Sequence, residues 1–124
     1  MEREGFVSLF IGNSNSYEEL QKYVSGNCTE DGDTIPSQFE EDFGIDYYDD
    51  DFREIEFYSE SSDDLRILLE GFSYDEKIVS EFIDICGDRL DRKVNSVILL
   101  YDFQYIGNID RASQFQFLGT VQYK

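Results

Sequence analysis

The side chains of this sequence that could carry out chemistry are mainly carboxylates. The chain has 28 Asp and Glu residues and no His. Without His, Ser-His-Asp and Cys-His catalysis, histidine-based RNA cleavage and histidine-ligated metal sites are excluded. No GxxxxGK[ST] or GxGxxG stretch is present, so no phosphate-binding loop is predicted. Chemistry by carboxylates alone remains, either as a paired acid and base or as an Mg²⁺ or Ca²⁺ site.

Two short acidic stretches are the places where a metal site would be sought. They are Asp31-Gly32-Asp33 and Asp49-Asp50-Asp51. Neither has the spacing of a calcium-binding loop, D-x-[DN]-x-[DN]-G-x5-E, and acidic runs usually form a solvated surface. We therefore predict no catalytic residues, no metal and no cofactor.

The negative charge is concentrated in one segment of the chain. The formal net charge is −18, and fourteen of these charges fall within residues 30–64, which hold fifteen carboxylates and one cation, Arg53. Crowding of this kind costs folding free energy through repulsion, and solubility alone would not require it. A plain solvated surface is one interpretation, and a docking surface for a cationic partner is the other. The same charge disfavours binding to nucleic acid or to a membrane.

Tyrosines lie within this acidic segment. Tyr47 and Tyr48 are neighbours, so on an extended segment one of them should face outward among carboxylates. An exposed Tyr surrounded by charge is a plausible binding anchor. The predicted partner-binding residues are Asp46, Tyr47, Tyr48, Asp49, Asp50, Asp51, Glu54 and Glu56.

The elements that must position these residues follow from periodicity and capping signals. Apolar alternation, which places Val7, Leu9 and Ile11 on one face, or β-branched and aromatic runs predict strands, and capping boxes followed by helical spacing predict helices. The predicted strands are 6–11, 54–58, 94–105 and 114–123, the last two as an antiparallel hairpin, and the predicted helices begin at Ser16, Ser37, Asp63 and Ser73. Residues 27–34 are polar and turn-rich, and residues 45–51 are expected to form a loop or a strand margin.

This order, β-α-α-β-α-α-β-β, predicts an α+β fold with helices packed on a largely antiparallel sheet of about four strands. At 124 residues a single domain, 1–124, is expected. No run of about 20 apolar residues and no basic signal-peptide start is seen, which favours a cytoplasmic protein. Cys28 and Cys86 lie far apart outside any CxxC motif; two thiols are expected, and a disulfide stays open. The oligomeric state is not predicted.

Several stretches, in their order and spacing, resemble a known family. They are SLFIGN (8–13), SQFEEDFGIDYYDDDFRE (37–54), LEGFS (69–73) and SVILLY (96–101). Together they resemble the immunity protein 22 family of bacterial polymorphic toxin systems. The resemblance implies a small cytoplasmic antidote, encoded beside a secreted toxin, that protects the producing cell by binding the toxin domain. It carries over no catalytic residues.

The leading hypothesis is therefore a protein that binds and neutralises a cognate toxin, with the acidic segment docking on a basic active-site groove such as that of a nuclease. A second hypothesis is a carboxylate-based Mg²⁺ or Ca²⁺ module or enzyme. A third is a regulatory protein-interaction domain whose partner is not a toxin.

Overall fold

The structure, a computed structural model, describes residues 2–28, 30–32, 34–46 and 48–124. Its main sheet is antiparallel throughout, with the strand order β4-β5-β1-β7-β6. The strands are β1 (Glu2–Gly12), β4 (Arg53–Asp64), β5 (Arg89–Phe103), β6 (Arg111–Ala112) and β7 (Phe115–Gln122). The predicted α+β class is confirmed, with five strands in this sheet rather than about four.

The predicted terminal hairpin is wrong. Strand β1 lies between β5 and β7 and pairs with both, while β7 forms its local hairpin with the short β6. The most apolar stretches, in β1 and β5, take neighbouring positions inside the sheet, where helices cover both faces and buried area is greatest.

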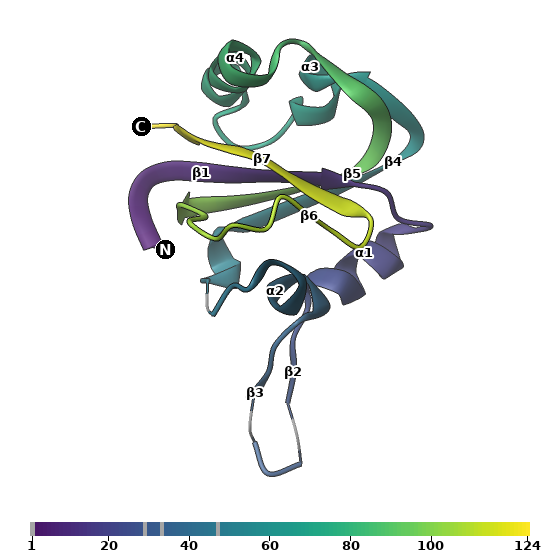
Figure 1. Ribbon diagram of the computed structural model, residues 1–124, viewed down its shortest axis with the longest axis vertical. Coiled ribbons are helices and arrows are strands. Elements are labelled where there is room, and N and C mark those ends of the chain that lie inside the picture. Colours follow the sequence, from purple (N-terminus) through teal and green to yellow (C-terminus); the bar gives the residue numbers. More distant parts are fainter. Residues whose placement is uncertain (1, 29, 33, 47) are drawn as a thin grey trace.

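The helices lie on the two faces of the sheet. They are α1 (Tyr17–Val24), α2 (Gln38–Phe43), α3 (Leu65–Leu69) and α4 (Asp75–Cys86), with a 3-10 turn, η1 (Asp50–Phe52), before β4. Figure 1 shows α3 and α4 above the sheet and α1 and α2 below it, so the molecule has three layers. A small second sheet, β2 (Asn27–Cys28) with β3 (Thr34–Ile35), projects from the α1 and α2 side and was predicted only as polar turn.

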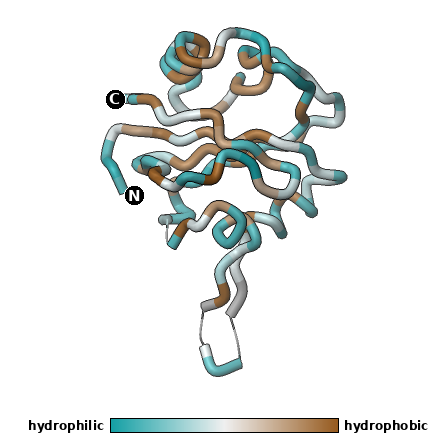
Figure 2. Tube along the Cα trace, in the orientation of Figure 1, coloured by the Kyte–Doolittle hydropathy of each residue, from teal (hydrophilic) through white to brown (hydrophobic). Residues whose placement is uncertain are grey.

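Two hydrophobic cores result, one on each face of the sheet. The predicted inward face of β1, with Val7, Leu9 and Ile11, packs against α3 and α4. Phe10 points to the other face, where its ring lies 4.9 Å from that of Phe39 and is fully buried. Figure 2 shows the resulting hydrophobic stretches along the central strands. Burial on both faces explains why these strands read as nearly continuous apolar runs.

The capping predictions are confirmed for α2 and wrong for α4. Ser37 and Glu40 form both hydrogen bonds of a capping box, and Gly44 ends α2 in the left-handed conformation with φ 66°. Helix α4 instead begins after Tyr74, which has φ 62° and makes no side-chain cap. The Ser73 hydroxyl is used elsewhere, on Glu54.

Candidate functional site

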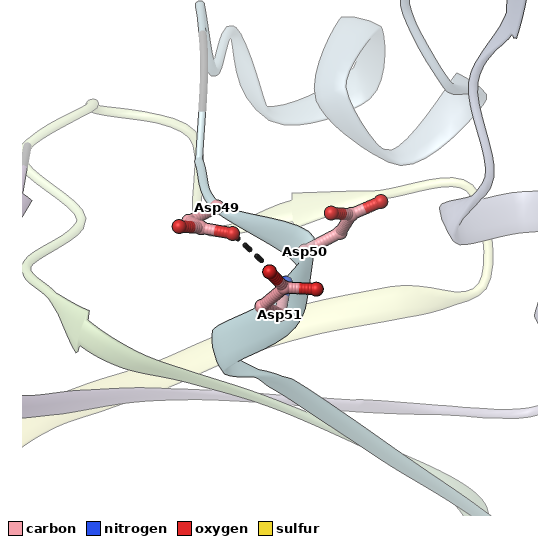
Figure 3. A group of neighbouring side chains, drawn as sticks. All are labelled: Asp49, Asp50 and Asp51. Atoms are coloured by element: carbon pink, nitrogen blue, oxygen red, sulfur yellow. Dashed lines mark hydrogen bonds between the residues drawn. The ribbon is translucent and has the colours of Figure 1, made fainter.

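Of the predicted binding residues that the structure describes, Asp46 and Tyr48 lie in the segment before η1, and the others lie along η1 and the first residues of β4. We call Asp49, Asp50, Asp51, Glu54 and Glu56 the acidic surface. One carboxylate oxygen from each of Asp49, Asp50 and Asp51 lies within 4.8 Å of the others, and Figure 3 shows the three side chains on the turn. Asp49 accepts a hydrogen bond of 3.0 Å from the backbone N–H of Asp51 and so caps η1. The cap explains why this run forms a turn instead of extending β4.

Three of the five residues of the acidic surface line one or both of two hollows. Glu54 and Asp51 line a hollow of about 190 Å³, and Glu54 with Glu56 lines a larger groove of about 860 Å³ on the other side. Glu54 thus belongs to both. Asp46 is exposed but lines neither of them.

The expected anchoring role of the tyrosine pair is not supported for Tyr48. Its side chain is 9% exposed and packs in the core beside Phe39. The core can hold this polar side chain because its hydroxyl forms hydrogen bonds inside the protein. That hydroxyl donates to the carbonyl oxygen of Val24 at 3.1 Å and accepts from Arg53 Nη1 at 2.9 Å. Burial raises the pKa of Tyr48, so the hydroxyl stays neutral. Tyr47 lies outside the described residues.

Arg53, the single cation of the acidic segment, lines the larger groove beside Glu54 and Glu56, but its guanidinium is bonded to groups inside the protein. Its Nη1 donates to the Val24 carbonyl at 3.0 Å as well as to Tyr48. The ion pairs among the described residues are Arg66–Asp88, Lys77–Glu81, Arg89–Asp63 and Arg111–Asp91. None of them includes a residue of the acidic surface, which therefore presents carboxylates without a basic partner from the described part of the chain.

The smaller hollow brings together residues that the sequence did not single out. We call it the tyrosine hollow, because Tyr74, Tyr101 and Tyr123 line it. Their rings lie 4.8 Å apart for Tyr74 and Tyr123 and 5.1 Å apart for Tyr101 and Tyr123. Tyr74 is 54% exposed, whereas the other two are buried beneath it. These residues come from the start of α4, from β5 and from the C-terminal end, so only the fold could place them together.

Carboxylates in the tyrosine hollow are held in place by hydrogen bonds. Tyr123 OH and the Gly5 N–H donate to Asp102 Oδ1 at 2.5 and 2.9 Å, and these bonds lower the pKa of Asp102. Glu54 accepts from Ser73 N at 2.9 Å and from Ser73 Oγ at 2.5 Å. Burial and the Glu54 charge raise the pKa of Tyr101. Fixed anions beside neutral phenols suit cationic groups, and the chain's own Lys124 lines the hollow with its Nζ 5.6 Å from the centroid of the Tyr123 ring.

Backbone strain coincides with the tyrosine hollow. Among the described non-glycine residues, Tyr74, Asp102 and Ser113 have positive φ, at 62°, 55° and 53°. The first two line the hollow. Such conformations cost free energy and often occur at binding sites. No signal in the sequence pointed to Tyr74, because left-handed backbone at a Tyr has no local motif.

The stretches behind the family resemblance are largely structural. Ser8 is fully buried, and its hydroxyl donates to the Phe103 carbonyl at 3.0 Å and lies 2.8 Å from Thr120 Oγ1. At Gly12 an added Cβ would lie 2.3 Å from the Gln114 carbonyl oxygen, so the close approach of β1 to this residue requires glycine there. These residues stabilise the packing of the sheet, and strand β4 of the same sheet carries Glu54 and Glu56 of the acidic surface.

The described part of the chain also bears on the two cysteines and on membrane-spanning helices. Burial raises the pKa of the Cys86 thiol, whose Sγ lies 3.9 Å from the Leu118 carbonyl oxygen, while the side chain of Cys28 lies outside the described residues. Of the helices in the described part of the chain, none combines the length and apolar character required to span a membrane.

Comparison with known proteins gives the family. No curated protein and no solved structure shows a match to this chain. A family model described as Immunity protein 22 matches residues 7–124, nearly the whole chain, and confirms the resemblance seen in the sequence. The chain therefore belongs to the Immunity protein 22 family.

Proposed function

We propose that this protein binds a cognate toxin domain through the acidic surface and neutralises it without catalysing a reaction. The observation that carries the proposal is the set of exposed or half-buried carboxylates, Asp49 to Asp51 with Glu54 and Glu56, that have no ion-pair partner among the described residues. Membership in an immunity-protein family supports the toxin as partner.

The mechanism follows from charge and position. A toxin that acts on a phosphate-containing substrate needs a basic groove, and carboxylates can occupy the positions of the substrate phosphates there. Inhibition is then steric and electrostatic. The net charge of −18 increases the rate of encounter with a basic partner and opposes binding to nucleic acid or anionic membranes. The protein acts in the cytoplasm of the producing cell, where the toxin would otherwise reach its target.

Charge reversal tests this surface. The triple variant Asp49→Lys, Asp50→Lys and Asp51→Lys is expected to weaken binding to an inactivated form of the toxin domain encoded in the adjacent gene. Close charge pairs across an interface contribute roughly 1.5–7 kcal/mol, so a loss of about a hundredfold or more in affinity is expected. The salt dependence of the association rate should fall with it.

The matched control reverses three exposed carboxylates outside this surface, Glu60, Glu76 and Asp84, and changes the net charge equally. It should retain most of the affinity. Equal losses in both triple variants would show that only net charge matters. An adjacent gene without a toxin domain, or a toxin domain that does not bind the wild-type protein, would refute the toxin as partner.

One observation favours the second candidate function, a carboxylate-based Mg²⁺ or Ca²⁺ module. The oxygens of Asp49, Asp50 and Asp51 are close enough to share a cation. A saturable heat on titration with either ion, abolished by Asp50→Asn, would support it. A third candidate, a regulatory domain, is separated from the proposed function by the identity of the partner alone.

A further inference from the structure

Strand β4 forms an edge of the main sheet, and the larger groove runs along it. In the strand order β4-β5-β1-β7-β6, β4 has a neighbour on one side only. The groove of about 860 Å³ is lined by residues 53–56 of β4, by the exposed side of α1 and by residues 70–73. The two helical layers thus form its walls, and the strand edge lies between them.

Four consecutive β4 residues line the groove, which means that the backbone itself faces it. Side chains of a strand alternate between the two faces of a sheet. Ile55 accordingly packs against the core on the α1 and α2 side, whereas Glu54 contacts Ser73 on the other. Because the side chains of Ile55 and Glu54 point to opposite faces, the part of both residues that faces the groove is the peptide backbone.

The direction of the backbone groups follows from two hydrogen bonds. Arg53 N–H donates to the Asp50 carbonyl oxygen, and Phe57 N–H donates to Glu56 Oε1 at 3.2 Å. Both donors therefore point away from β5. Because hydrogen-bonding direction alternates along an antiparallel strand, the N–H and C=O of Ile55 point into the groove as well. Ile55 offers the donor and acceptor that an added strand requires.

The residues that line the groove favour a positively charged occupant. Glu18, Glu54, Glu56 and Glu70 line it together with Lys22 and Arg53, and the Arg53 guanidinium is held by Val24 and Tyr48. The Glu56 carboxylate also occupies the Phe57 donor, which protects the edge from indiscriminate pairing. A cationic side chain arriving along the edge would draw Glu56 away and free that donor.

We propose that the β4 edge receives an extended, Lys- or Arg-containing segment of the toxin as an additional strand of the sheet. Main-chain hydrogen bonds to Ile55 and its neighbours would contribute affinity, and the surrounding carboxylates would select a basic sequence. The inference rests on the proposed function, since the toxin domain supplies the strand.

A proline substitution tests the inference directly. Ile55→Pro removes the N–H that points into the groove, and edge strands tolerate Pro where the N–H faces outward. Ile55→Ala is the matched control, because it removes the packed side chain but keeps the donor. Binding of both variants to the inactivated toxin domain is measured by surface plasmon resonance, with folding checked by circular dichroism. The Pro variant is expected to bind about tenfold more weakly than the Ala variant.

Hydrogen exchange of the wild-type protein gives a second measurement that does not depend on the Pro variant folding. The amides of Ile55 and Phe57 should exchange at least tenfold more slowly in the complex. Equal affinity of the Pro and Ala variants, or unchanged exchange at these amides in a complex that does form, would overturn the added strand and leave the proposed function standing. Failure of the wild-type protein to bind the toxin domain would instead refute the proposed function.

Discussion

Tyr48 provides the sharpest test of how the acidic surface is positioned. The sequence favoured it as a contact residue, whereas the structure buries it and uses its hydroxyl to join α1 to the start of β4. We expect Tyr48→Phe to lower the free energy of unfolding by about 1–2 kcal/mol, while toxin affinity stays within about threefold of wild type. Tyr48 would then be a positioning residue.

The magnitude follows from the bonds that are lost and those that remain. The substitution removes a 3.1 Å bond to the Val24 carbonyl and a 2.9 Å bond from the Arg53 guanidinium. The Val24 carbonyl keeps the 3.0 Å bond from Arg53, and the ring keeps its place beside Phe39 and Phe103. Tyr48→Ala would also leave a cavity, so its cost should be larger, about 3–5 kcal/mol.

Urea denaturation gives the unfolding free energies, and surface plasmon resonance with the inactivated toxin domain gives the affinities. The reasoning would be refuted if Tyr48→Phe weakened toxin binding tenfold while the free energy of unfolding stayed unchanged. That pair of results would make the hydroxyl an interface group.

Three further predictions concern charge and backbone. At 4.8 Å two unit charges in bulk water repel by about 0.9 kcal/mol, so Asp50→Asn should raise the melting temperature measured by calorimetry by about 2–5 °C. The same substitution should slow toxin association, measured by stopped flow, about two- to fivefold. Gly44→Ala should cost about 1 kcal/mol in urea denaturation, because φ is 66° there while nothing would contact the new methyl group; no loss would mean that α2 does not end in this conformation. The pKa of Asp102 is lowered on folding, so its stabilising effect is present above the unfolded pKa of about 3.9 and is lost as pH falls through the folded value. Asn tolerates the φ of 55° at this position, so Asp102→Asn is a suitable variant. The difference in unfolding free energy between wild type and this variant should therefore shrink in acid. A difference independent of pH would contradict the bond from Tyr123 to a charged carboxylate.

Local signals predicted most elements because their energies act within one turn or one strand. The Ser37 capping box and Gly44 define α2 by bonds that span three or four residues. The alternation of Val7, Leu9 and Ile11 predicted one buried face of β1 for the same reason. The Ser73 box failed because the Ser73 hydroxyl bonds to Glu54, 19 residues away, and no local pattern reports such a partner.

The sequence by itself determined the chemistry available to this protein: carboxylates concentrated in residues 30–64, no histidine, and an α+β pattern. Only the tertiary structure decided where that chemistry faces. It placed β1 between β5 and β7, turned Tyr48 and Arg53 inward, and left the edge of β4 open beside four glutamates. Strand neighbours and side-chain directions depend on contacts between segments far apart in the chain, whose packing energies outweigh local preference.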